Sequence, residues 1–175
     1  LLDLVRKGCE KPMASGPNVM FSGPCGTGKT TLQAVRFLAA AEAGIDAAFV
    51  DSIDIRKLVS DLNSKFSETA VRADREFDRL VRREALFWSD VGDTQATRRE
   101  FAETIASMLE RFTGRLDVSS NLSPPELEGH PDIGQRAVSR MLAGRGGKPA
   151  VLVSLDGPDQ RSQGIELPQE VRSEE

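Results

Sequence analysis

The chain has 175 residues, 39% of them hydrophobic, which is enough for one domain with a sizeable core. Its formal net charge of −4 argues against a general basic coat for nucleic acid, although a local basic stripe stays open because net charge says nothing about distribution. The sequence has no apolar run of about 18 residues, no secretory signal and only two cysteines, Cys9 and Cys25, so we expect a cytoplasmic protein with reduced thiols and no membrane span.

Composition divides the chain into three parts. Residues 1–16 begin with apolar side chains that could end a preceding helix, and they continue into a loop with Gly, Pro and Ser. We expect residues 17–161 to form the core domain. Residues 162–175 are polar, and we expect a loose tail there.

The most specific motif lies at residues 23–30, which match the phosphate-loop pattern G-x-x-x-x-G-K-[ST] at every fixed position. A short apolar run precedes the motif and a helix-forming stretch, residues 31–43, follows it, as a strand–loop–helix unit requires. The glycines let backbone N–H groups point at phosphate oxygens, and the helix N-terminus adds partial positive charge. We therefore predict a nucleoside triphosphate site, with Lys29 on the β- and γ-phosphates and the Thr30 hydroxyl on Mg²⁺. The predicted phosphate-binding residues are Gly23, Pro24, Cys25, Gly26, Thr27, Gly28, Lys29, Thr30 and Thr31.

A second short strand is predicted at residues 47–50, followed by a helix whose apolar residues recur at i, i+3, i+4 and i+7 from Ile55. Ser52 is the expected N-cap of that helix. Residues 65–83 then carry many charges of both signs around a narrow apolar stripe, which predicts a further helix. Two interpretations of this segment stay open: a solvated face with i,i+4 ion pairs, or a basic surface for nucleic-acid phosphates.

Three more strands follow in alternation with helices. The third strand is expected at residues 85–88 and runs into Asp90. The fourth strand, at residues 116–120, has a weaker pattern because Asp117 interrupts it, and it runs into Asn121. The fifth strand is expected at residues 150–153. The intervening helices cover residues 101–112 and 132–143, and the second of these carries Arg136 and Arg140.

Alternating strands and helices predict an α/β fold, a five-stranded parallel sheet between two layers of helices. Ligands of such sheets bind at the carboxyl ends of the strands, so the phosphate loop, Asp90 and Asn121 should meet at one edge. Asp90 is the candidate Mg²⁺ ligand, and Asn121 could reach the γ-phosphate or the attacking water. Asn121 also suits a plain turn, and Arg136 and Arg140 suit a solvated helix surface.

Four stretches together resemble the DnaC/IstB-type AAA+ ATPases, which are helicase loaders and transposition helper ATPases. The stretches are GPCGTGKTTL at 23–32, FWSDVG at 87–92, SSNLSP at 119–124 and QRAVSRML at 135–142. The resemblance covers about residues 17–161 and implies an AAA+ P-loop NTPase fold and ATPase activity with ATP and Mg²⁺. It also implies that Asp90 belongs to the Walker B strand, that Asn121 is sensor 1, and that Arg140, with Arg136 beside it, is an arginine finger acting on a neighbouring subunit. Arg161 would be the sensor 2 arginine.

One departure from the family concerns the Walker B strand, which usually ends in two adjacent acidic residues. Here the first of the two is Ser89, so one carboxylate is missing in either register of the motif. Asp93 could replace it only if the loop bends back. We therefore expect slow hydrolysis, or a nucleotide-dependent switch.

The family implies single-stranded DNA and a replicative helicase as partners, or a transposase for a transposition helper. A self-oligomer follows from the arginine finger, and no membrane partner is expected. A binding module that no longer hydrolyses ATP is the alternative that Ser89 favours. A small-molecule P-loop kinase is a further alternative, although such a kinase would not need Asn121 at the end of a strand or the later pair Arg136 and Arg140.

Overall fold

The computed structural model describes residues 16–93, 99–143 and 149–157. Its elements are β1 (Val19–Ser22), α2 (Lys29–Glu42), β2 (Ala47–Asp51), α3 (Ser52–Leu62), α4 (Ser67–Val81), β3 (Ala85–Ser89), α5 (Arg99–Arg111), β4 (Arg115–Ser120), α6 (Pro124–Glu128), α7 (Gly134–Leu142) and β5 (Val151–Ser154). All strands pair in parallel, in the order β2-β3-β4-β1-β5. The predicted α/β fold with a five-stranded parallel sheet is therefore confirmed.

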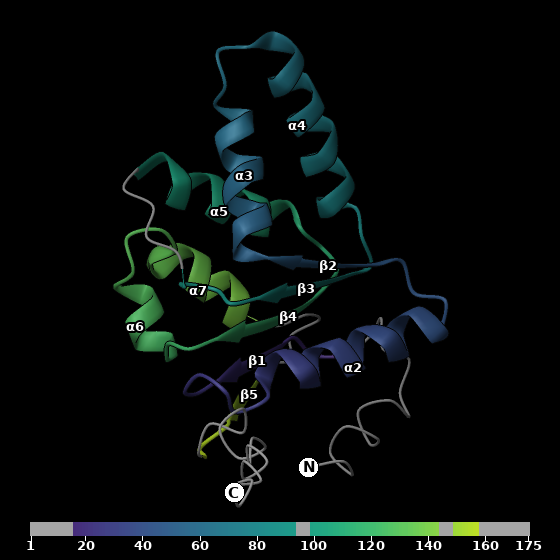
Figure 1. The fold of residues 1–175 in the computed structure, drawn as a ribbon, viewed down its shortest axis with the longest axis vertical. Helices are drawn as coiled ribbons and strands as arrows, with labels where there is room; N and C mark the ends of the chain where they lie inside the picture. The colour runs from purple at the N-terminus through teal and green to yellow at the C-terminus, as the bar shows by residue number, and fades with distance from the viewer. Residues whose placement is uncertain (1–15, 94–98, 144–148, 158–175) are drawn as a thin grey trace, which may run out of the picture.

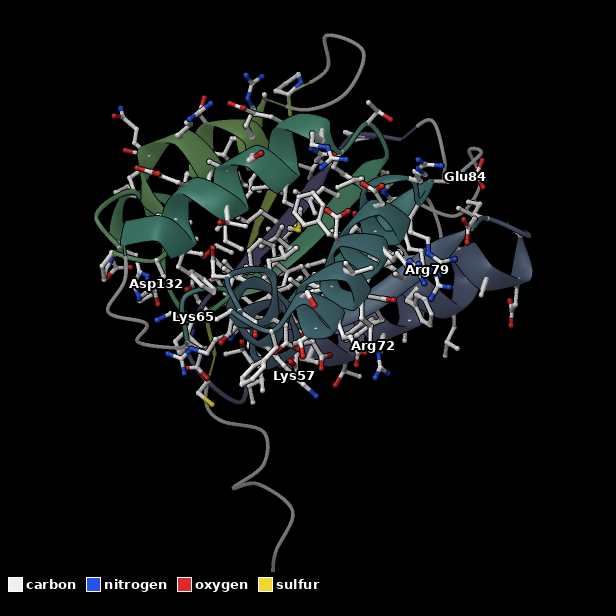
Figure 2. The ribbon with its side chains drawn as sticks, turned by 90° about the horizontal axis from the view of Figure 1, so that it is seen from above. Lys57, Lys65, Arg72, Arg79, Glu84 and Asp132 are labelled. Carbon is white, nitrogen blue, oxygen red and sulfur yellow. The ribbon has the colours of Figure 1, made fainter. Side chains whose placement is uncertain are left out.

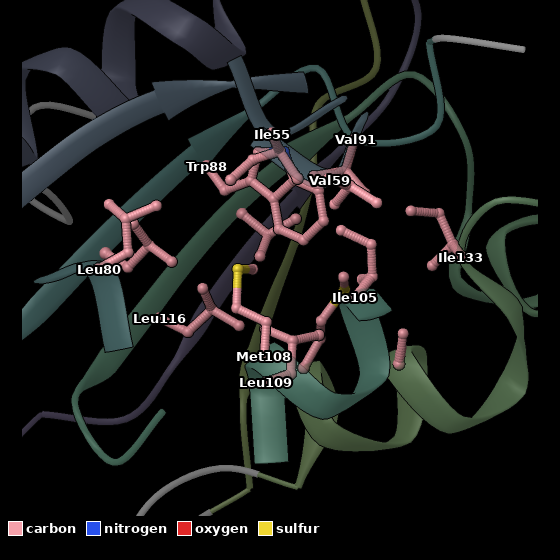
Figure 3. Packing of buried hydrophobic residues seen from close by; sticks show 14 of the residues in the cluster. Ile55, Val59, Leu80, Trp88, Val91, Ile105, Met108, Leu109, Leu116 and Ile133 are labelled. Atoms are coloured by element: carbon pink, nitrogen blue, oxygen red, sulfur yellow. The ribbon is translucent and has the colours of Figure 1, made fainter. Parts of the chain in front are cut away.

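Helices cover both faces of the sheet (Figure 1). Within the described residues, α2 packs on one face, where Phe37 meets the rings of Phe49 and Phe87 at centroid distances of 5.7 and 5.5 Å. Side chains of α3, α4, α5, α6 and α7 form the larger core with the other face. Figure 3 shows its centre, where Trp88 of β3 packs with Ile55 and Val59 of α3 and lies near Ile105 of α5. Burial of these large side chains holds the strand ends, and thus the site, in place.

The expectation that Asp117 interrupts the fourth strand is wrong. Asp117 lies inside β4 and is fully buried, and its carboxylate accepts hydrogen bonds from the Arg36 guanidinium at 2.8 Å and from Arg115 at 3.0 Å. A buried carboxylate is tolerated when it is paired and hydrogen-bonded. Two arginines, one from α2 and one from β4 itself, therefore let the strand run without a break.

The predicted N-cap of α3, Ser52, is also wrong by one residue. Asp51 is the N-cap of α3, and its side chain accepts a hydrogen bond from the Asp54 N–H at 2.7 Å in a capping box. The Ser52 hydroxyl instead accepts from the Trp88 ring N–H at 3.1 Å and donates to the carbonyl oxygen of Asp90 at 2.8 Å. Ser52 thus ties the start of α3 to the chain segment that leaves β3.

The charged segment forms α4, and several of its arginines are paired. Arg79 contacts Glu76 at 3.4 Å, Arg82 contacts Asp78 at 3.9 Å, and Arg83, just after the helix, pairs with Asp46. These contacts favour the interpretation of a solvated face with ion pairs for the C-terminal end of α4. Figure 2 looks down on the α3–α4 end of the molecule and shows where the other basic residues lie, with Lys57, Lys65 and Arg72 labelled.

Some predictions fall on residues outside the described ranges. They are the lead-in up to residue 15 with Cys9, the tail at 162–175, and Arg161. Among the described residues, no helix is long and apolar enough to cross a membrane.

Candidate nucleotide-binding site

The loop between β1 and α2 needs glycine for steric reasons. Gly23 has a φ of 144°, and a Cβ atom there would lie 2.2 Å from the carbonyl oxygen of Leu155, next to β5. Gly28, with a φ of 86°, is the N-cap of α2. A positive φ at these positions excludes most other residues. The sequence therefore forms a loop that wraps the first turn of α2, where unpaired backbone N–H groups attract anions.

Lys29 begins α2 and is 4% exposed. Its ammonium group donates to the carbonyl oxygens of Gly23 and Pro24, at 2.7 and 2.6 Å. The same loop is closed by the Thr27 hydroxyl, which donates to the Pro24 carbonyl at 2.9 Å. The lysine charge is thereby placed inside the curve of the loop, where it lines the adjacent cavity.

The cavity beside the loop has a volume of about 350 Å³, within the range of small-molecule sites. It brings together the phosphate loop, the chain after β3 and the chain after β4. Its lining residues are Cys25, Gly26, Gly28, Lys29, Thr30, Thr31, Asp90, Asp93 and Asn121. The predicted residues Gly23, Pro24 and Thr27 support the loop without lining the cavity.

The segment after β3 is held by the end of β4. Asp90 has a φ of 57°, a conformation that Asp tolerates better than most residues, and its N–H donates to the Ser119 hydroxyl at 3.3 Å. The N–H of the next residue, Val91, donates to the Ser119 carbonyl oxygen at 2.9 Å, and the Val91 carbonyl oxygen accepts a hydrogen bond from the Ser120 hydroxyl at 2.6 Å. Because Asn121 directly follows this strand, these bonds fix Asp90 and Asn121 relative to each other.

The lining side chains suit a divalent cation between protein and polyphosphate. Thr30, Asp90, Asp93 and Asn121 offer hydroxyl, carboxylate and amide oxygens, the donors that Mg²⁺ prefers. In the described part of the chain no group of three or more His, Cys, Asp or Glu residues could hold a metal by itself. That is consistent with Mg²⁺, which is commonly held by one or two carboxylates together with substrate phosphates.

Sequence reasoning missed Gln33, which is fully buried beneath the site. Its amide group donates to the carbonyl oxygens of Trp88 at 3.1 Å and Asp117 at 2.8 Å, and its oxygen accepts from the Ser119 hydroxyl at 3.1 Å. Gln33 thus joins the phosphate-loop helix to both strands that carry the catalytic candidates. A signal was available in the sequence, because Lys29, Gln33, Arg36 and Ala40 follow helical spacing on one face of α2.

Arg136 and Arg140 do not reach the cavity. Both lie on α7, 66% and 53% exposed, and both contact Glu110 of α5. Arg136 makes two hydrogen bonds of 2.8 Å to this carboxylate, whereas Arg140 lies 3.6 Å from it. The hydrogen bond from Arg136 and the charges of both arginines hold the pKa of Glu110 below its usual value. The two arginines therefore lie on the surface of the described structure, away from the cavity.

Comparison with solved structures finds proteins of similar fold. The DnaC helicase loader matches with a TM-score of 0.69 and 19% identity over 89% of this chain and 88% of that one. AMPPCP-bound DnaA from Aquifex aeolicus matches with a TM-score of 0.62 and 21% identity over 97% of this chain. DnaI matches with a TM-score of 0.64 and 20% identity, over 91% of this chain and 82% of that one.

This chain has the fold of these proteins. At 19–21% identity the likeness concerns the fold alone. The chain spans about half the length of the DnaA chain from Aquifex aeolicus, 53% of it. No protein-family model matches the sequence, and no curated protein matches it either.

Proposed function

We propose that this chain is an ATPase of the DnaC/IstB type that binds ATP with Mg²⁺ and acts as a helicase loader in DNA replication. The observation that carries the proposal is the single cavity lined by the phosphate loop, Asp90 and Asn121. Its geometry suits a triphosphate at the N-terminus of α2, and solved neighbours of the same fold include DnaA bound to the ATP analogue AMPPCP.

Each lining residue has a role in this proposal. The backbone N–H groups of the loop and the Lys29 ammonium bind the β- and γ-phosphates, and Thr30 and Asp90 hold Mg²⁺. When bound, Mg²⁺ neutralises charge that develops on the transferring phosphoryl oxygens. Asn121 orients the attacking water beside the γ-phosphate. Cys25 and Thr31 border the phosphates, and the sensor 2 role of Arg161 remains a proposal.

Among the described residues, no arginine lines the cavity. Arg140, with Arg136 beside it, lies on the exposed surface of α7, so we assign it to the γ-phosphate of a neighbouring subunit. A guanidinium group stabilises charge spread over phosphoryl oxygens, and an arginine finger is worth a factor of about 10³–10⁵ in rate. Function then requires a self-oligomer that forms with ATP.

Two variants test the nucleotide site and the oligomer separately. Lys29→Ala should abolish ATP binding in a fluorescence titration, while the exposed Lys57→Ala keeps the parent affinity. Arg140→Ala should keep ATP affinity but lose ATP-dependent assembly in size-exclusion chromatography and lose turnover. Parent-like assembly and turnover by Arg140→Ala would exclude the arginine finger, and parent-like binding by Lys29→Ala would exclude the site.

Single-stranded DNA is the proposed nucleic-acid partner, and the α3–α4 end is the proposed contact. The likeness to DnaA bound to single-stranded DNA supports it, with a TM-score of 0.64 at 19% identity over 97% of this chain and 52% of that chain. Among the described residues, Arg72 and Arg75 are exposed and make no ion pair, unlike Arg79 and Arg82. Replacing the first two arginines with Ser should weaken DNA binding and flatten its dependence on salt, whereas replacing Arg79 and Arg82 should change both less. If replacing Arg72 and Arg75 weakened DNA binding no more than replacing Arg79 and Arg82, the proposed contact would be wrong.

Two alternatives keep the same site. A transposition helper ATPase would bind a transposase instead of a replicative helicase, which affinity capture with each purified partner distinguishes. A binding module that does not hydrolyse ATP is favoured by Ser89 at the end of β3. Tight ATP binding without phosphate release would select that module.

A further inference from the structure

The end of β3 provides no carboxylate for a cation. Ser89 is the last residue of this strand, is 2% exposed, and does not line the cavity. The carboxylates that do line the cavity, Asp90 and Asp93, both come from the turn that follows. The structure thus replaces an adjacent acidic pair with two acidic residues three positions apart.

A well-fixed turn brings Asp93 back to the cavity. The Asp93 N–H donates to the Asp90 carbonyl at 3.1 Å, and Gly92 between them has a φ of 82°, as type II turns require at their third position. A Cβ atom on Gly92 would lie 2.8 Å from a methyl carbon of Leu127 and 2.9 Å from one of Leu122. Val91, at 0% exposure, anchors the turn in the core. The position of Asp93 is therefore a product of packing.

Charge balance indicates what the two carboxylates are for. The phosphate loop opposite them is suited to a polyphosphate, and carboxylates facing a polyphosphate repel it unless a cation lies between them. Mg²⁺ is commonly held by one or two carboxylates together with substrate phosphates. The Thr30 hydroxyl, which lines the same cavity, adds a further oxygen.

We propose that Asp93 is a ligand of the divalent cation, directly or through a bound water, and supplies the carboxylate that Ser89 lacks. This inference rests on the proposed nucleotide site and adds a residue to it. Asp90, Asp93 and Thr30 would then hold the cation together with the phosphates.

The test measures metal binding apart from turnover. Asp93→Asn is compared with the parent and with Asp74→Asn, a control that removes the same charge from an exposed position on α4. Affinity for a fluorescent ATP analogue is measured in EDTA and in Mg²⁺, and Mn²⁺ affinity is measured by electron paramagnetic resonance with ATP present. All three proteins should melt alike, because position 93 is exposed.

Asp93→Asn should bind the analogue in EDTA at least as tightly as the parent, lose the gain from Mg²⁺, and bind Mn²⁺ at least tenfold more weakly. Asp74→Asn should match the parent throughout. Parent-like Mn²⁺ affinity in Asp93→Asn would overturn the role of Asp93 alone, even if turnover fell. A parent that binds no nucleotide in either buffer would overturn the proposed function and this inference together.

Discussion

Replacing Gly23 with Ala tests whether the contact between the phosphate loop and the chain after β5 shapes the site. The new Cβ atom would lie 2.2 Å from the Leu155 carbonyl oxygen, so the two backbones would have to separate by about 1 Å. That shift weakens the hydrogen bond from the Leu155 N–H to the Ser22 carbonyl, which is 2.8 Å long. Side-chain rotation cannot relieve the clash, because both atoms belong to or adjoin the backbone.

Two costs add up in this variant. A residue other than Gly at a φ of 144° costs about 1–3 kcal/mol, and the lost hydrogen bond costs about 0.5–1.5 kcal/mol. Together they lower the free energy of unfolding by about 1.5–4.5 kcal/mol, and the melting temperature by about 3–18 °C for a domain of this size. ATP affinity should fall as well, because the loop moves away from its cavity.

Gly44→Ala is the matched control. Gly44 has a φ of 73°, but a Cβ atom there meets nothing within 4 Å, so the variant should lose only about 1 kcal/mol and keep its ATP affinity. Thermal unfolding followed by circular dichroism and a nucleotide titration measure both effects. If Gly23→Ala melts no lower than Gly44→Ala, the contact with Leu155 does not constrain the loop.

Two further predictions concern the supports of the site. Gln33→Met removes three buried hydrogen bonds at similar volume and should lower the free energy of unfolding, measured in urea, by about 1–3 kcal/mol. The control Gln135→Met changes an exposed residue and should change this free energy by less than about 0.5 kcal/mol. Equal urea midpoints for the two variants would show that Gln33 is not a structural link. Glu110→Gln should lower the melting temperature slightly at pH 7. The pKa of Glu110 in the folded protein lies below its ordinary value of 4.5, so its contribution to stability is present above pH 4.5 and is lost as the pH falls through the folded pKa. The melting temperatures of the parent and of Glu110→Gln should therefore converge in acid. A difference that stays constant with pH would contradict the pairing with Arg136 and Arg140.

Much of the site was predictable from sequence because its chemistry is local. Eight consecutive residues determine the phosphate loop, since glycine at a positive φ and the start of a helix are both properties of a short segment. Strand and helix alternation then determined the parallel sheet, and with it the edge where Asp90 and Asn121 meet. Each of these inferences needed only the order of elements along the chain.

Contacts between distant segments were not predictable in the same way. Asp117 looked like a break in a strand because its partner Arg36 lies 81 positions away. Gln33 looked like an ordinary helix residue until the strand carbonyls beneath it were placed. Whether Arg136 and Arg140 turn inward or outward depended on how α7 packs against α5.

The sequence by itself determined that the chain folds as a parallel α/β domain with a phosphate loop at the edge of its sheet. It left open which carboxylate could stand in for the acidic residue missing at position 89. Only the tertiary structure shows that Asp93 lines the cavity, because the turn from Asp90 to Asp93 is set by a buried Val91 and by bonds to β4. A motif records neighbours along the chain, whereas the direction of a loop depends on what it packs against.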